Sequence, residues 1–114
     1  MNTKPKSEQT SGHWLAFYLV SPFQLEYFDS YGHHLSSYPL ILNYFASLFT
    51  NLNYTFSNNK LQSLTSSVCG DYCITFLHLR IRNYSFSQII NLFIKFPSIH
   101  SLDSFVHCYS LLIQ

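Results

Sequence analysis

Charged side chains are scarce in this sequence of 114 residues, where Asp, Glu, Lys and Arg together make up 10% of the chain. Six Lys and Arg against five Asp and Glu give a formal net charge of +1, and the basic residues are scattered. Nucleic-acid binding without sequence preference needs clustered cations to neutralise phosphates. The sequence therefore predicts no nucleic-acid partner.

Long apolar runs are also missing, because Asn, Ser or Lys interrupts segments such as 40–42 and 89–94 within a few residues. A membrane-spanning helix needs about 20 apolar residues, so no membrane partner is predicted. The N-terminal segment MNTKPKSEQTSG lacks the apolar centre of a secretory signal. Three cysteines are an odd number, which suits a reducing compartment better than a disulfide scaffold. An intracellular protein, nuclear or cytoplasmic, is expected.

Apolar residues are plentiful, at 47% of the chain with 18% aromatic. A chain of this length has room for one domain with a single small core. Residues 1–12 are polar and contain Pro5, which predicts a flexible lead-in. Residues 13–114 are expected to form the folded domain.

The first folded segments are predicted to be strands. HWLAFYLV, residues 13–20, is rich in aromatic and branched residues, and FQLEYFDSYG, residues 23–32, follows a Ser-Pro turn. A turn this short predicts an antiparallel hairpin. The start of one strand then lies beside the end of the next, which brings His13 into contact with Asp29.

Helices are predicted for most of the remaining chain. Apolar residues recur at helical spacing over residues 39–50 and from Val68 onward. A strand is expected on one or both sides of the Asn58-Asn59 turn. Residues 85–96 open with a Ser85-Gln88 capping box, and a last helix with Ser101 or Asp103 as its cap is expected after Pro97.

Cys69 stands at the start of the helix that begins near residue 68. Backbone N–H groups and the positive end of the helix dipole favour a thiolate at such a position. Gly70 leaves room for a substrate backbone to approach the sulfur. Asp71 would oppose the effect by raising the thiol pKa, unless its carboxylate points outward and complements the helix start.

An attacking thiolate needs a base, a group that orients the base and donors for the oxyanion. His13 and Asp29 can supply the base and its orienting partner. The side-chain amide of Gln62 and the backbone N–H of Cys69 can supply the donors. Taken singly, these residues read as a core histidine, a turn aspartate, a surface glutamine and a buried cysteine. Taken together, they predict a site for acyl transfer.

The segments GHWLAFYLV, EYFDSYG and LQSLTSSVCGDYCITFLHL resemble the adenovirus endopeptidase (adenain) family and, more distantly, the proteases of SUMO and other ubiquitin-like proteins. The shared motif is His-Trp at a strand start, an acidic residue after the next strand, then Gln, a short loop and Cys-Gly on a helix. The step from Gln62 to Cys69 is closest to the adenovirus-like branch, which includes relatives carried by virus-like DNA transposons. The resemblance covers residues 11–80.

The resemblance implies an α+β, papain-like or adenain-like cysteine protease core, with a small mixed sheet and the catalytic cysteine at the start of a buried helix. It assigns the catalytic roles to His13, Asp29, Gln62 and Cys69. The implied function is a cysteine endopeptidase that processes viral or transposon-encoded precursor proteins after a small residue such as glycine. No metal or organic cofactor is implied. The alternatives are a protease specific for SUMO or another ubiquitin-like protein, and an inactive truncated remnant that binds proteins.

Two departures from the family affect the expected partners. Family members carry several dozen residues before the catalytic histidine, whereas residues 1–12 precede His13 here, so the core is expected to be truncated at its N-terminus. No cysteine lies between His13 and Gln62, so a disulfide-linked activating peptide is not expected. A protein or peptide substrate is the predicted partner, and an activating peptide or partner chain held in another way stays open.

Other reactive side chains have simpler interpretations. Cys73 and Cys108 are predicted to be small core residues. A zinc site made from Cys69, Cys73, His100, His107 and Cys108 is disfavoured because the spacings match no common pattern. His33 and His34 are expected at the surface and His78 in a structural contact. Trp14 is either a core residue or a lid beside His13.

Overall fold

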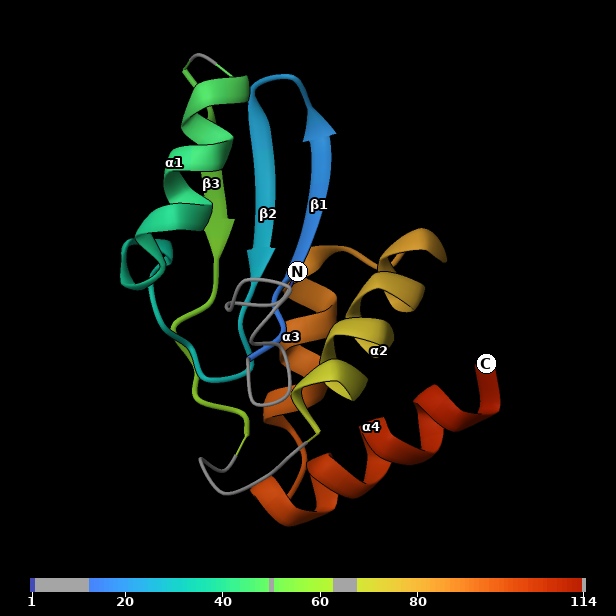
Figure 1. Ribbon diagram of the computed structural model, residues 1–114. Coiled ribbons are helices and arrows are strands. Elements are labelled where there is room, and N and C mark those ends of the chain that lie inside the picture. The colour runs from blue at the N-terminus through green and yellow to red at the C-terminus, as the bar shows by residue number, and fades with distance from the viewer. Residues whose placement is uncertain (2–12, 50, 63–67, 114) are drawn as a thin grey trace.

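The computed structural model describes residues 1, 13–49, 51–62 and 68–113. These residues form a small mixed α+β fold, as predicted (Figure 1). The elements in chain order are β1 (Ala16–Ser21), β2 (Gln24–Phe28), the 3-10 helix η2 (Leu35–Ser37), α1 (Pro39–Leu48), β3 (Asn53–Phe56), α2 (Cys69–Ile81), α3 (Phe86–Ile94) and α4 (Ile99–Ile113).

The three strands form one sheet in the order β1-β2-β3. β1 and β2 are antiparallel, with Ala16 opposite Phe28, so the predicted hairpin is confirmed. β3 pairs with β2 in parallel, with Tyr54 opposite Leu25. Parallel neighbours require a crossover connection, and α1 lies in that connection. Among the described residues near the Asn58-Asn59 turn, the strand is β3, which precedes the turn.

The sheet separates two apolar clusters, because successive side chains of a strand point to opposite faces. Leu25 and Tyr27 belong to a cluster with Phe45 of α1. Ala16 and Phe28 belong to the other cluster, which α2, α3 and α4 complete. Figure 1 shows α1 on one side of the sheet and the three later helices on the other. The result is a three-layer arrangement with α2 packed against the hairpin.

Helix α2 is fixed to the sheet by contacts in its middle and near its C-terminal end. Phe76, fully buried, stacks on Phe28 with ring centroids 4.8 Å apart. Near the end of the helix, Arg80 Nε lies 2.8 Å from Glu26 Oε1 of β2. Its guanidinium also lies 4.5 Å from the ring centroid of Tyr18 in β1. These contacts set the position of the helix start, where Cys69 lies, relative to the hairpin.

The predicted capping box of α3 is confirmed, since Ser85 and Gln88 bond each other's backbone N–H groups. The predicted caps of the last helix are wrong, because α4 begins at Ile99. The hydroxyl of Ser98 accepts a hydrogen bond from the backbone N–H of Ser101, at 3.0 Å. Ser98 thus satisfies a donor of the first turn, as an N-cap residue does.

The prediction for Cys73 is confirmed, since its side chain is buried, but the prediction for Cys108 is wrong, since Cys108 is exposed. The buried residues of α4 are Leu102, Val106 and Ser110, which recur every four residues. A residue two positions from Val106 is turned about 200° around the helix. Cys108 therefore faces away from the core.

Two predictions concern residues outside the described ranges. The predicted lead-in, residues 1–12, lies outside the described residues apart from Met1, and so does Thr50, the predicted end of the first long helix. None of the helices in the described residues is long and apolar enough to cross a membrane.

Candidate active site

His13 and Asp29 meet at the open end of the β1–β2 hairpin. The register of the hairpin places Ala16 opposite Phe28, so the residues just before Ala16 lie beside the residues just after Phe28. His13 Nε2 is 2.6 Å from Asp29 Oδ1. The side chain of His13 is 11% exposed and that of Asp29 is 0% exposed. The predicted contact is present, and it is shielded from water.

The carboxylate of Asp29 is held by several donors besides the imidazole. Oδ1 accepts from the backbone N–H of Tyr31 and Oδ2 from the hydroxyl of Tyr38, each at 2.8 Å. Longer bonds of 3.3 Å come from the Tyr27 hydroxyl and the His33 N–H. Burial alone would raise the pKa of Asp29, but the hydrogen bonds from the imidazole, Tyr31 and Tyr38 lower it overall. Asp29 is therefore a fixed anion.

Cys69 begins α2 and hydrogen-bonds the imidazole of His13. Burial would raise the pKa of its thiol, but a hydrogen bond with His13 and backbone hydrogen bonds from Trp14 and Gly70 lower it overall. Burial would lower the pKa of His13, but hydrogen bonds with Asp29 and Cys69 raise it to about 9. These opposite shifts favour a thiolate beside an imidazolium at neutral pH.

Gln62 is fully buried, so its interpretation as a surface residue does not hold. Ser30 donates its hydroxyl hydrogen to Gln62 Oε1 at 2.5 Å. The carbonyl of Ser30 also accepts the backbone N–H groups of Leu61 and Gln62. The carboxamide is thus held through its oxygen. The predicted oxyanion role would use its NH2 group, which is the donor end of a carboxamide.

The turn after Asp29 is packed directly against the segment that leads to Gln62. Gly32 has φ +74, and a Cβ at this position would lie 2.7 Å from the backbone oxygens of Asn58 and Asn59. Both the positive φ and the close approach require glycine. Gly32 thereby lets the segments of Asp29 and Gln62 run side by side. The loop 63–67 between Gln62 and Cys69 lies outside the described residues.

Trp14 lies at the surface beside the helix start, with 42% of its area exposed. A Cβ on Gly70 would lie 3.8 Å from Trp14 Cδ1, so the indole borders the open space next to Cys69. Of the two interpretations of Trp14, the exposure favours the lid over the core residue. His33 and His34 are exposed, as predicted.

Residues on α4 contact α2 close to Cys69. Asp71 accepts hydrogen bonds from Ser110 Oγ at 2.5 Å and contacts His107 Nδ1 at 3.0 Å. The carboxylate thus faces α4. His78 makes the structural contact that was predicted, with Nδ1 2.7 Å from the Tyr109 hydroxyl.

The five residues considered for zinc do not come together. Within residues 1, 13–49, 51–62 and 68–113, no group of three or more His, Cys, Asp or Glu side chains could hold a metal ion.

Sequence reasoning missed the polar residues that hold the site in place. Tyr31 stacks on the ring of His13, with centroids 4.1 Å apart and an interplanar angle of 19°. The Tyr38 hydroxyl binds Asp29, and the Ser30 hydroxyl binds Gln62. Tyr31 stands two residues after Asp29, which a strand-end pattern could have suggested. No spacing rule predicts the contacts of Tyr38 and Ser30, because their partners lie 9 and 32 residues away in the sequence.

The chain matches no family model, no curated protein and no solved structure. The resemblance to the adenain family therefore depends on the quoted segments, and the candidate site depends on its own geometry.

Tyr72 links the helix of Cys69 to the segment of Gln62, which yields a test of the predicted oxyanion donor. Its hydroxyl lies 3.1 Å from the Leu61 carbonyl and 2.6 Å from Asp103 Oδ1. We expect Tyr72→Phe to lower kcat for peptide hydrolysis by up to about tenfold, because the lost hydrogen bond to the neutral Leu61 carbonyl, next to Gln62, contributes roughly 0.5–1.5 kcal/mol. The ionisation of Cys69, measured by the pH dependence of alkylation with iodoacetamide, should be unchanged.

Tyr109→Phe is the matched control, since it removes a tyrosine hydroxyl that bonds His78 and not the Gln62 segment. Its kcat should equal that of the wild-type chain. A wild-type kcat in Tyr72→Phe would contradict the positioning role of the hydroxyl.

Proposed function

We propose that this chain is a cysteine endopeptidase with Cys69 as nucleophile and His13 as its base. The observation that carries the proposal is that one imidazole hydrogen-bonds both a buried carboxylate and a buried thiol. Nε2 bonds Asp29 at 2.6 Å, and the ring also hydrogen-bonds Cys69. Burial alone would lower the pKa of His13, so its raised pKa depends on the hydrogen bonds with Asp29 and Cys69.

The reaction begins when the Cys69 thiolate attacks the scissile carbonyl carbon and forms a C–S bond. The carbonyl oxygen becomes an oxyanion, which the Gln62 amide and the Cys69 N–H stabilise. The tetrahedral intermediate collapses, the C–N bond breaks, and the His13 imidazolium gives its proton to the leaving amine. The neutral imidazole then takes a proton from water as water attacks the thioester, which releases the acid and restores the ion pair.

The adenain-like identity of the core is part of the proposal. It is supported by the ordered set of His13, Asp29, Gln62 and Cys69, and by Cys69 standing at the first residue of a helix packed on the hairpin. The substrate proposed on the same basis is a viral or transposon-encoded precursor protein cut after glycine. The nearness of the Trp14 ring to Gly70 supports a small residue at the cleavage point, because a larger side chain would meet the indole.

A thiol-reactive peptide probe tests the proposal directly. A peptide vinyl ester with glycine at the reactive end should label Cys69 in the full chain at pH 7. His13→Ala should abolish the labelling, because the thiol loses its ion-pair partner, whereas Cys108→Ala should leave it unchanged. The readout is the modified cysteine in a peptide map. Labelling that ignores the His13 substitution would refute the triad, and no labelling at all would favour the inactive remnant.

The pH dependence of hydrolysis follows from the two shifted groups. The ion pair forms as pH rises through the lowered pKa of Cys69, and it is lost as pH rises through the His13 pKa of about 9. We therefore expect a bell-shaped profile of kcat/KM whose alkaline limb falls near pH 9. An alkaline limb near pH 6.5, the ordinary value for histidine, would contradict the proposed pairing.

A further inference from the structure

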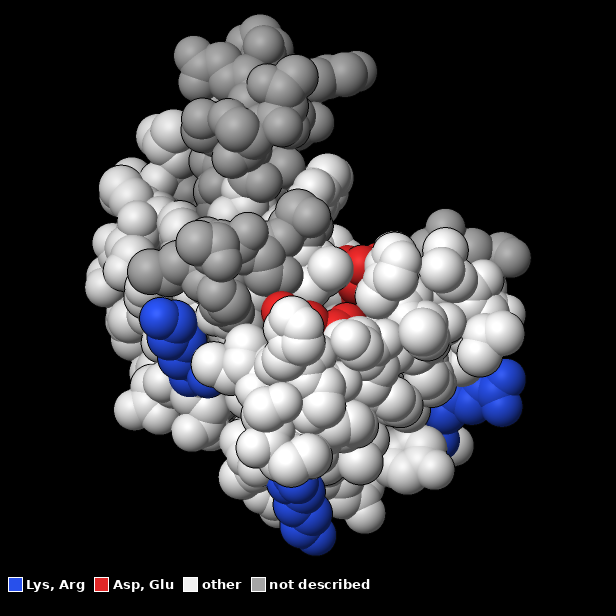
Figure 2. All heavy atoms as spheres, turned by 90° about the horizontal axis from the view of Figure 1, so that it is seen from below, with Lys and Arg blue, Asp and Glu red and all other residues white. Residues whose placement is uncertain are grey.

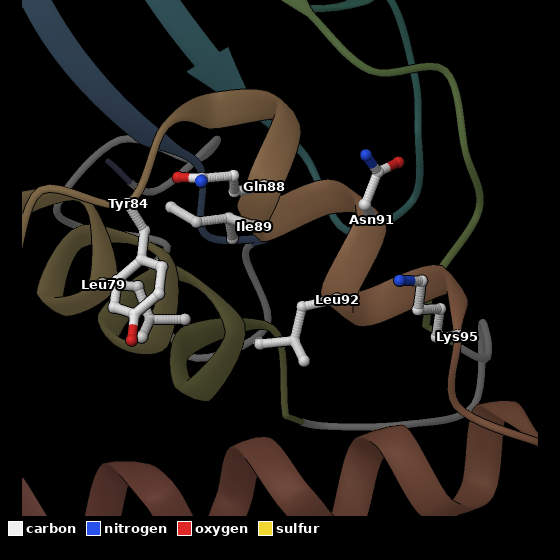
Figure 3. Close-up of a pocket in the computed structure, with 7 residues that line it drawn as sticks. All are labelled: Leu79, Tyr84, Gln88, Ile89, Asn91, Leu92 and Lys95. Carbon is white, nitrogen blue, oxygen red and sulfur yellow. The ribbon is translucent and has the colours of Figure 1, made fainter.

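A groove lies between the second half of α2 and helix α3. Its cavity measures about 360 Å³. The floor is apolar, with Leu79 8% exposed and Ile89 1% exposed. The walls remain open to water, since Tyr84 is 51% exposed and Leu92 is 41% exposed. Figure 3 shows Leu79 and Tyr84 on one side of the cavity, with Ile89 and Leu92 extending from α3.

The groove continues into a second hollow toward the end of α4. The two hollows share Leu79 and Tyr84, and the second one measures about 450 Å³. Leu112 and Ile113 of α4 line it, and Leu112 is 85% exposed. Single exposed apolar residues are common, but a continuous apolar surface with a buried floor marks an interaction site. We call the two hollows together the α2–α4 groove.

The charged side chains of the α2–α4 groove all carry one sign. Lys95 lines the first hollow and Arg82 lines the second, and no Asp or Glu among the described residues lines either one. Among the described residues, the ion pairs are those of His13, Arg80 and His107, so Lys95 and Arg82 are in none of them. Figure 2 shows Lys and Arg side chains at separate places on the edge of the molecule, away from the acidic atoms near its centre.

We propose that the α2–α4 groove binds a segment of another protein that combines apolar side chains with Asp or Glu. Apolar anchors would occupy the space above Leu79 and Ile89, while carboxylates would meet Arg82 and Lys95 at the rim. A second copy of the chain fits less well, because it would bring the same two cations against themselves. The described carboxylates of the chain are already engaged with His13, Arg80, His107 and Tyr72.

The groove is separate from the candidate active site. Leu79 is ten residues after Cys69 on the same helix, which corresponds to about 15 Å at 1.5 Å per residue. The bound segment is therefore held at a distance from the cysteine, and its binding does not require catalysis. The groove can be tested in a chain whose Cys69 has been replaced, so the test is independent of the proposed function.

The probe is a phage-displayed library of random 12-residue peptides, selected on the full chain. We expect the enriched peptides to contain two or more apolar residues together with Asp or Glu. Synthetic fluorescein-labelled copies should bind with an affinity that falls in high salt. Leu92→Asp, at an exposed wall position, should weaken binding about tenfold or more. Arg82→Glu combined with Lys95→Glu should do the same.

Lys60→Glu is the control, because Lys60 is exposed and lines neither hollow. It should leave the affinity unchanged, and circular dichroism should show that all variants are folded. Enriched peptides that are basic or uncharged would overturn the proposal, as would equal weakening by Lys60→Glu. Selection of no peptide that distinguishes wild type from Leu92→Asp would also overturn it. If the chain self-associates and Leu92→Asp abolishes the self-association, the groove binds a second copy of the chain, and the proposed foreign segment is wrong.

Discussion

Replacing Cys69 with alanine is expected to lower kcat for a fluorogenic peptide with glycine before the scissile bond by about ten-thousandfold or more. In the proposed mechanism the Cys69 sulfur is the atom that forms a bond to the substrate, and the other described residues of the site act through protons and hydrogen bonds. Cys69→Ser should be almost as inactive, because a serine hydroxyl is far too weak an acid to form an anion beside one imidazolium. The measurement is steady-state hydrolysis at pH 7.

The other cysteines provide matched controls for this result. Cys108 is exposed, so Cys108→Ala should keep the wild-type kcat. Cys73 lies one turn after Cys69, and burial raises the pKa of its thiol to about 12. Cys73→Ala should therefore affect the free energy of unfolding more than kcat. Hydrolysis by Cys69→Ala within tenfold of wild type would end the proposal that Cys69 is the nucleophile.

Asp29→Ala is expected to reduce the free energy of unfolding by about 3–5 kcal/mol at pH 7. The substitution removes a buried anion and leaves the hydroxyls of Tyr27 and Tyr38 and the imidazole of His13 without their common acceptor. Removal of one partner from a buried charged pair carries a cost of this size. Since small domains have free energies of unfolding of about 5–15 kcal/mol, the loss is severe. Urea denaturation provides the measurement.

The effect of Asp29 should depend on pH in a defined direction. Its pKa is lower in the folded chain than the usual 3.8. The folded state thus binds the proton more weakly than the unfolded state, so the carboxylate stabilises the fold above about pH 4. This contribution is lost as pH falls through the folded pKa, and the difference between wild type and Asp29→Ala should shrink in acid. Asp103→Ala, which removes a less buried carboxylate with one tyrosine partner, should reduce the free energy of unfolding by a smaller amount, about 1.5–3 kcal/mol. A constant difference down to pH 2 would contradict the assigned ionisation.

Local patterns predict the parts of this fold that depend on neighbours in sequence. The hairpin follows from two β-rich segments around a short turn, and that topology is enough to bring His13 to Asp29. The start of α2 at Cys69 follows from its apolar periodicity. The capping box at Ser85 follows from a spacing of three residues. Each of these features is decided within about twenty residues.

The features that prediction missed depend on contacts between distant segments. The burial of Gln62 arises because Ser30 binds both its side chain and its backbone. The stacking of Tyr31 on His13 and the bond from Tyr38 to Asp29 depend on how the chain turns after the hairpin. Cys108 could have been placed correctly, since the helical positions of Leu102 and Val106 already direct it away from the core.

The contact between His13 and Asp29 should form earlier in folding than the contact of either residue with Cys69. His13 and Asp29 are sixteen residues apart and share a local hairpin, whereas Cys69 reaches them only when α2 packs on the sheet. Contacts between distant segments form late because closing a long loop is entropically costly. During synthesis the base and its carboxylate leave the ribosome well before the thiol does. We therefore expect the Cys69 thiol to keep an ordinary pKa until α2 docks on the hairpin, so a nascent chain lacks the ion pair proposed to activate it.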